Sequence, residues 1–116
     1  MTQNTHITDD GLPNLMTSDS IAAANKMLPS YMIGGLMRYM NDGTRPGDFL
    51  SAVLKNNLMD AFSYADETNA QSVRDWARWL YNYAPSQAFG SVGRFTSWCD
   101  RGGLRGHIAT QEFPDV

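Results

Sequence analysis

The stretch VRDWARWLYNYAP, residues Val73–Pro85, constrains the fold more than any other part of this chain. Its apolar residues recur at spacings of three and four, which is the period of an α-helix. On a wheel of about 100° per residue the apolar arc covers more than half of the circumference, so we expect this helix to have neighbours on more than one side. The residues of that arc are Val73, Trp76, Ala77, Trp79, Leu80, Tyr81, Tyr83 and Ala84.

The charged residues of the same stretch lie on the opposite arc. Arg74, Arg78 and Asn82 share that arc, so the aromatic residues are predicted to be mainly core and the arginines to project outward. Trp79 and Tyr81 stand at the edges of the apolar arc. We therefore expect these two residues to border a groove or a subunit interface.

The rest of the chain shows helical periodicity without sustained alternation of polar and apolar residues, which predicts an all-α fold. We expect a single compact bundle of about four or five helices over residues 17–103, a flexible polar arm over 1–16 and an irregular tail over 104–116. The expected N-caps are Ser18 or Ser20, Thr68 and Ser91, and two further helices are expected to start at Pro29 or Ser30 and near Pro46. The expected stops include Gly43 and Gly102-Gly103.

Composition narrows the class of protein. A chain of 116 residues with 42 % hydrophobic content suits one domain with its own core. Cys99 is the single cysteine, so neither an internal disulfide nor a cysteine-based metal site can form. The first residues, MTQNTHITDD, lack a basic segment and an apolar run, so we expect no signal peptide, no membrane span and a cytoplasmic location.

Charge is distributed unevenly along the chain. The net charge of −3 argues against nonspecific nucleic-acid binding, but residues 70–108 carry five arginines against Asp75 and Asp100. These arginines either form a solvated surface with ion pairs or recognise carboxylate or phosphate groups. The candidate binding residues are Arg74, Arg78, Trp79, Tyr81, Asn82, Arg94, Arg101 and Arg105.

Two further features have open interpretations. The cluster of Met16, Met27, Met32, Met37 and Met40 either fills the core, which we favour, or forms an adaptable surface for a partner. Asn57 falls inside the apolar stripe of the helix that follows Pro46, where it either fixes helix register or contacts a ligand.

Catalytic patterns are weak in this sequence. Cys99 and His107 suggest a nucleophile and a base, but Cys99 lies on the apolar stripe of its helix, where a free cysteine is usually a small buried hydrophobe. No HExxH motif, phosphate-binding glycine loop or EF-hand pattern is present. The motif DRGGLRG is similar to RNA-binding tails, although a helix stop explains its glycines. We expect no enzyme, no cofactor and no metal site.

Residues 28 to 98 resemble a family of small proteins encoded by tailed phages and prophages. The motifs that carry the resemblance are PGDFLSAVLKNNL, ADETN, LYNYAP and FGS, at Pro46–Leu58, Ala65–Asn69, Leu80–Pro85 and Phe89–Ser91. The chain departs from the family pattern at Asp48, where glycine is expected, and at Phe89, where tryptophan is expected. The resemblance implies a genetic setting and no mechanism.

That setting favours binding over catalysis. We expect a non-enzymatic phage accessory protein, a homo-oligomer, that acts by stoichiometric binding. Its partner would be a host protein, such as a defence protein that it antagonises, or a nucleotide signal that it sequesters. In the second case the arginines would hold phosphates while Tyr81 or Trp79 stacks on a base. The alternative is nucleic-acid binding in phage replication or regulation, which the overall acidity disfavours.

Overall fold

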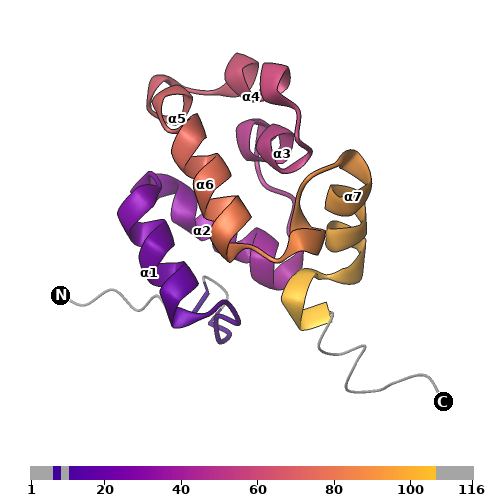
Figure 1. The fold of residues 1–116 in the computed structure, drawn as a ribbon. Coiled ribbons are helices and arrows are strands. Elements are labelled where there is room, and N and C mark those ends of the chain that lie inside the picture. The colour runs from indigo at the N-terminus through magenta and orange to yellow at the C-terminus, as the bar shows by residue number, and fades with distance from the viewer. Residues whose placement is uncertain (1–6, 9–10, 107–116) are drawn as a thin grey trace.

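The computed structural model describes residues 7–8 and 11–106, and over these residues the chain is helical, without strands. The all-α prediction is confirmed, but the expected count of four or five helices is too low. The described part of the chain forms seven α-helices and one short 3₁₀ helix (Figure 1). They are α1 (Ser18–Met27), α2 (Ser30–Asp42), α3 (Asp48–Leu54), α4 (Leu58–Tyr64), α5 (Glu67–Gln71), α6 (Val73–Tyr83), η1 (Ser86–Ala88) and α7 (Val92–Arg101).

The helix expected after Pro46 is two helices, because the chain breaks at Asn56 and Asn57. Asn56 has a φ of 63°, in the left-handed region that asparagine enters more readily than most residues. The side-chain oxygen of Asn57 accepts the Asp60 amide at 3.0 Å and caps α4. The prediction that Asn57 lies within a continuous buried stripe is therefore wrong, since Asn57 is an exposed cap.

The helix expected from Thr68 is also divided. Asp66, rather than Thr68, supplies the N-cap of α5, and its carboxylate accepts the Asn69 amide at 2.7 Å. At Ser72 the backbone turns to a φ of −102° and a ψ of 4°, which ends α5 and lets α6 start at Val73. The chain thus changes direction before the aromatic-rich segment.

Other helix boundaries agree with expectation. Gly43 and Gly102 adopt left-handed conformations at the ends of α2 and α7, and the Ser91 hydroxyl caps α7 by accepting the Arg94 amide at 3.1 Å. For α1 the prediction of Ser18 or Ser20 as the N-cap is wrong, although the helix does begin at Ser18. Thr17 is the cap, and its hydroxyl accepts the Ser20 amide at 3.1 Å.

Aromatic side chains dominate the core and tie the helices together through their polar atoms. The Trp79 indole donates to the Ser20 carbonyl at 3.0 Å and joins α6 to α1, which lie side by side in Figure 1. The Trp98 indole donates to the Tyr39 carbonyl at 2.9 Å and joins α7 to α2. Buried aromatic residues need such partners for their polar groups, so these bonds help to fix the packing of the helices.

The methionine cluster belongs to the core, as the favoured interpretation predicts. Met16, Met37 and Met40 are buried, and Met27 and Met32 are partly buried against the same core. Met59, outside that cluster, is 80 % exposed on α4.

Asn41 is buried, although the wheel places it on the polar arc of α2. Its amide nitrogen donates to the Met37 carbonyl and to the Asn14 side chain, each at 2.9 Å, and its oxygen accepts the Leu15 amide. These bonds hold residues 14–16, which we assigned to the N-terminal arm, against α2. Burial of this polar side chain is compensated by a complete set of partners.

Residues 103–106 add a helical turn after α7, where the sequence led us to expect the irregular tail to begin. The Arg105 guanidinium pairs with Asp42 and donates to the Pro13 carbonyl and the Thr8 hydroxyl. Arg105 therefore fastens this turn to α2 and to the N-terminal segment.

Candidate functional site

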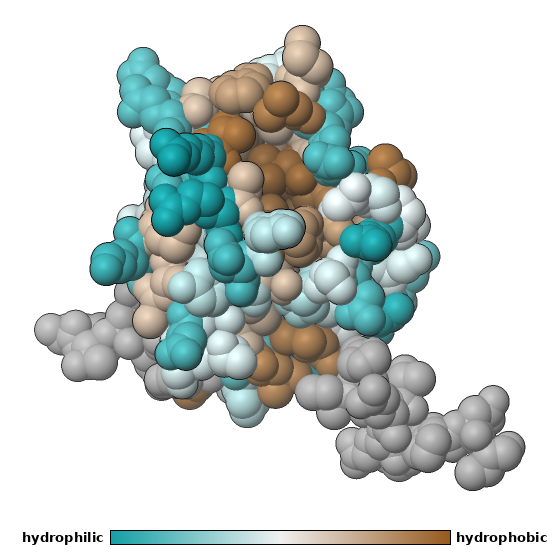
Figure 2. All heavy atoms as spheres, viewed as in Figure 1, coloured by the Kyte–Doolittle hydropathy of each residue, from teal (hydrophilic) through white to brown (hydrophobic). Residues whose placement is uncertain are grey.

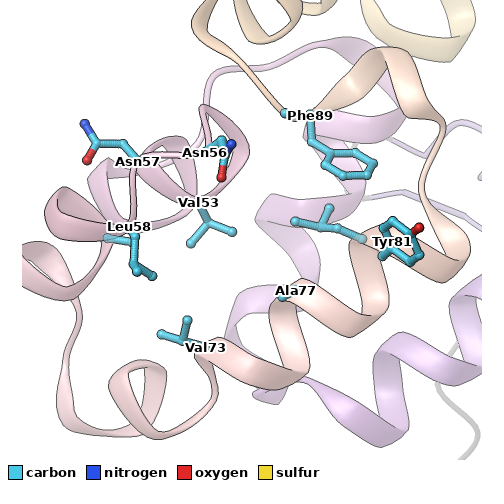
Figure 3. A pocket seen from close by; sticks show the side chains of 11 residues that line it. Val53, Asn56, Asn57, Leu58, Val73, Ala77, Tyr81 and Phe89 are labelled. Atoms are coloured by element: carbon cyan, nitrogen blue, oxygen red, sulfur yellow. The ribbon is translucent and has the colours of Figure 1, made fainter.

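The break between α3 and α4 borders an apolar pocket of about 290 Å³, which we call the α4–α6 pocket (Figure 3). It is lined by Val53, Asn56, Asn57, Leu58, Ala61, Val73, Ala77, Leu80, Tyr81, Phe89 and Gly90. Among the residues that the structure describes, no charged side chain lines it. The lining is therefore chemically suited to an apolar group.

Three parts of the chain build the walls. Helix α6 supplies Val73, Ala77 and Tyr81 at intervals of four, so these residues follow one another along one face. Helices α3 and α4 pack together and form the opposite wall, with Val53 and Asn56 from the end of α3 and its turn, and Leu58 and Ala61 from α4. The third wall is the loop at Phe89 and Gly90.

The loop wall is fixed by one backbone hydrogen bond. The Gly90 amide donates to the Leu54 carbonyl at 2.8 Å, at the last residue of α3. Phe89 is thereby placed beside the end of α3, and Figure 3 shows its ring facing the side chains of α6. The scaffold therefore holds this wall in place through α3.

The pocket has a buried floor and an open mouth. Ala61 and Leu80 are 1 % and 3 % exposed, whereas Leu58 and Tyr81 are 59 % and 84 % exposed. The prediction that Tyr81 borders a groove is confirmed by its place in this lining. Asn57 is part of the lining, but Figure 3 shows its side chain directed away from the centre of the pocket, where it caps α4.

Exposed apolar side chains continue from the mouth along α4. We call Leu58, Met59 and Phe62, which are 59 %, 80 % and 49 % exposed, the α4 patch. Figure 2 shows hydrophobic side chains gathered around a hollow in the upper half of the face, over α3, α4 and α6. Leu58 belongs to both the pocket lining and the α4 patch, and Phe62 follows it four residues on along the same face of α4, whereas Met59 lies further round the helix.

Arginines lie beside the α6 wall. Arg74 and Arg78 are exposed, as predicted. Arg78 stands three residues before Tyr81 and Arg74 three before Ala77, which makes them neighbours of the pocket lining on the helix surface. Within residues 11–106 neither arginine forms an ion pair.

A third arginine lies beside the loop wall. The Arg94 guanidinium donates to the Ser86 and Phe89 carbonyls at 3.2 and 3.5 Å. These carbonyls fix its position, and no carboxylate of residues 11–106 pairs with its positive charge. The pocket is thus bordered by positive charge on both the α6 side and the loop side.

The structure corrects the prediction for Trp79. Its ring is fully buried and its indole nitrogen bonds to α1, so it cannot stack on a ligand. Asn82 is exposed but donates its amide to the Arg78 carbonyl at 2.8 Å, within α6. Neither residue joins the pocket.

The remaining candidates do not converge on one site. The Arg101 guanidinium lies 5.9 Å from the centre of the Trp98 ring, and Arg105 is committed to Asp42 and the N-terminal segment. The basic C-terminal third is therefore dispersed over several surfaces, which reduces the support for a nucleic-acid interface.

Titratable groups outside the pocket do not form a catalytic set in the described part of the chain. Burial raises the pKa of the Cys99 thiol, which makes it a poor nucleophile, and its proposed partner His107 lies outside the described residues. On the surface, the Tyr31 hydroxyl donates to Asp66 at 2.5 Å. That hydrogen bond lowers the pKa of Asp66 and raises the pKa of Tyr31. Over residues 7–8 and 11–106 no group of three or more histidine, cysteine or carboxylate side chains could hold a metal.

Asn56 and Asn57 are the residues whose role sequence reasoning missed. Two consecutive asparagines inside an apolar period, with Asp60 three residues after Asn57, are typical of a left-handed turn followed by a capped helix. This pattern was the available signal for the corner that borders the pocket.

Comparison with known proteins returns no significant match to a protein-family model, a curated protein or a solved structure. Every helix in the described residues falls short of the length and apolar character needed to cross a bilayer. The geometry of the α4–α6 pocket is therefore the main basis for a functional proposal.

Proposed function

We propose that this protein acts without catalysis, by stoichiometric binding of a partner protein at the α4–α6 pocket and the α4 patch. The observation that carries the proposal is an open, uncharged pocket whose mouth adjoins exposed Leu58 and Phe62, with Met59 exposed on the same short helix. Contiguous exposed apolar surfaces of this kind mark protein–protein sites, because leaving them in water is unfavourable.

The composition of the surface also suits protein binding. Protein interfaces are enriched in tyrosine, methionine, phenylalanine and arginine, and their strongest contacts are anchors that fill pockets. Tyr81, Met59, Phe62 and Arg78 supply these residue types around one pocket. A partner side chain in the pocket would be surrounded by contacts that exclude water.

The resemblance to a phage-encoded family supports a narrower form of the proposal. In that setting the partner is a host protein in the cytoplasm of the infected cell, and binding antagonises it, for example in host defence. The protein itself would be a homo-oligomer, so light scattering should give a mass above the 12.9 kDa of one chain.

The experiment compares partner recovery by three tagged proteins from infected cells. Wild type and Val92→Asp should recover one protein in equal molar amount, whereas Met59→Asp combined with Phe62→Asp should lose it. Val92 is the matched control, because it is 60 % exposed but lies on α7 and outside the pocket lining. Equal recovery by all three proteins would contradict the proposal.

Sequestration of a nucleotide is a second candidate, supported by the exposure of Tyr81 next to Arg78. A ring that is 84 % exposed can stack on a base while a neighbouring guanidinium contacts phosphate. Calorimetric titration with mononucleotides and cyclic dinucleotides should then show binding that Tyr81→Ser abolishes. Absence of heat with every nucleotide would remove this candidate.

A further inference from the structure

We infer that the partner segment at the α4–α6 pocket is acidic: a large apolar side chain enters the pocket, and carboxylates beside it contact Arg74 and Arg78. This inference rests on the proposed function and specifies the chemistry of the partner. It follows from the pocket lining and from the charges around it.

The size and lining of the pocket indicate which partner side chain would enter it. Its volume of about 290 Å³ is at the lower end of the range for small-molecule sites, which suits a single bulky side chain. Most of the lining is apolar, and of its two asparagines Asn57 is already bonded to the amide and the carboxylate of Asp60. An apolar anchor therefore fits this lining better than a polar base does.

The arginines that border the pocket indicate which charge the partner carries beside its anchor residue. Arg74 and Arg78 lie next to the α6 wall, and Arg94 lies next to the loop wall. The guanidinium group matches carboxylate geometry and binds it through paired hydrogen bonds. Partner carboxylates on either side of the anchor would meet positive charge, although the chain as a whole carries −3.

Within the described residues, no carboxylate forms an ion pair with Arg74, Arg78 or Arg94. Asp60 follows Leu58 by two residues, so it lies across α4 from the pocket, where it accepts the Asn57 amide at 2.9 Å. Asp75 precedes Ala77 by two residues, so it lies on the far side of α6 from the pocket. It also stands three residues before Arg78, but the two form no ion pair within the described residues. Electrostatic complementarity therefore favours an acidic segment and disfavours a basic one.

The test selects short random peptides displayed on a carrier against the folded full chain. Wild type should enrich peptides that carry one large apolar residue with aspartate or glutamate on its flanks. The double variant Arg74→Glu/Arg78→Glu should enrich the same anchor with lysine or arginine on its flanks, because the sign of the border is reversed.

Affinities of one selected peptide then measure the effect. Arg74→Glu/Arg78→Glu should weaken an acidic peptide by roughly tenfold or more, and rising salt should weaken its binding to wild type. The matched control is Lys26→Glu/Arg101→Glu, which makes the same charge change at exposed positions outside the pocket lining and should leave the affinity unchanged.

The outcomes separate this inference from the proposed function. Apolar-anchored peptides with neutral or basic flanks on wild type would overturn the acidic partner and leave the docking site intact. No selected peptides, or peptides insensitive to Met59→Asp/Phe62→Asp, would overturn both. A dimer in light scattering that Met59→Asp/Phe62→Asp dissociates would show that a second copy occupies the surface, and would also overturn the acidic partner.

Discussion

Trp79 and Tyr81 provide a direct test of the boundary between core and binding surface. They lie two residues apart on α6, so their side chains point to different sides of the helix. Trp79 is fully buried, whereas Tyr81 is 84 % exposed at the mouth of the pocket. We expect Trp79→Phe to destabilise the fold and Tyr81→Ser to leave its stability nearly unchanged.

The magnitude follows from what each substitution removes. Trp79→Phe deletes the indole donor that bonds to the Ser20 carbonyl at 3.0 Å. The Ser20 carbonyl lies within α1 and keeps its helical partner, the Ala24 amide, so the loss is that of one hydrogen bond, about 0.5–1.5 kcal/mol. The smaller ring also leaves a cavity that costs about 1 kcal/mol, for a total of about 1.5–2.5 kcal/mol. Tyr81→Ser removes few contacts and exchanges residues of similar helix propensity, so we expect a change within about 0.5 kcal/mol.

Urea unfolding followed by far-ultraviolet circular dichroism measures both free energies of unfolding. The expected difference is a large fraction of the total stability of a domain, which is about 5–15 kcal/mol, so it is readily resolved. A loss for Tyr81→Ser as large as that for Trp79→Phe would show that Tyr81 is packed. The pocket would then lack the open mouth on which the proposed docking site depends.

Three further substitutions test the elements that position the pocket or join the helices. Gly43→Ala should lower the free energy of unfolding, measured in urea, more than Gly11→Ala does. A Cβ at Gly43 would lie 2.8 Å from the Trp98 carbonyl, whereas a Cβ at Gly11 would meet nothing within 4 Å. Gly11→Ala therefore introduces only the strain of a positive φ, about 1–2 kcal/mol. Equal losses would contradict the close approach of α2 to α7. Asn57→Ala should lower the free energy of unfolding by about 1 kcal/mol through loss of the α4 cap, and an unchanged value would show that the cap is unimportant. Tyr31→Phe should raise the pKa of Asp66 toward its ordinary value in a carboxyl NMR titration. The pKa of Asp66 is lower in the folded than in the unfolded protein, so the ionised carboxylate stabilises the fold above the unfolded pKa of about 3.9. This stabilisation is lost as the pH falls, so the free energies of unfolding of wild type and Tyr31→Phe should converge in acid.

The sequence was a good guide to residues whose role is local. Gly43 and Gly102 end helices because a left-handed residue is needed there, and Ser91 begins one because its hydroxyl accepts a free amide. The outward position of Arg74 and Arg78 follows equally from helix geometry. Such features depend on the adjacent chain alone, so a single sequence is sufficient to predict them.

Burial on α6 was harder to predict, because it depends on distant segments. The wheel places Trp79 at the edge of the apolar arc, but α1 lies along that edge and its Ser20 carbonyl accepts the indole. The wheel places Tyr81 at the other edge, where no helix of the described chain covers it, and its ring remains exposed. Apolar character indicates which faces are available for packing, while the path of the chain decides which of them are covered.

The pocket itself depends on the asparagine corner that periodicity concealed. Leu50, Leu54, Leu58 and Ala61 keep the helical spacing across the corner, so the hydrophobic pattern gives no sign that the axis changes. A straight helix would carry Leu58 and Ala61 onward along the axis of α3. The left-handed Asn56 instead turns α4 back against α3 and places both residues opposite the pocket face of α6. The candidate site therefore exists because the two asparagines turn the backbone where the hydrophobic pattern alone would predict one straight helix.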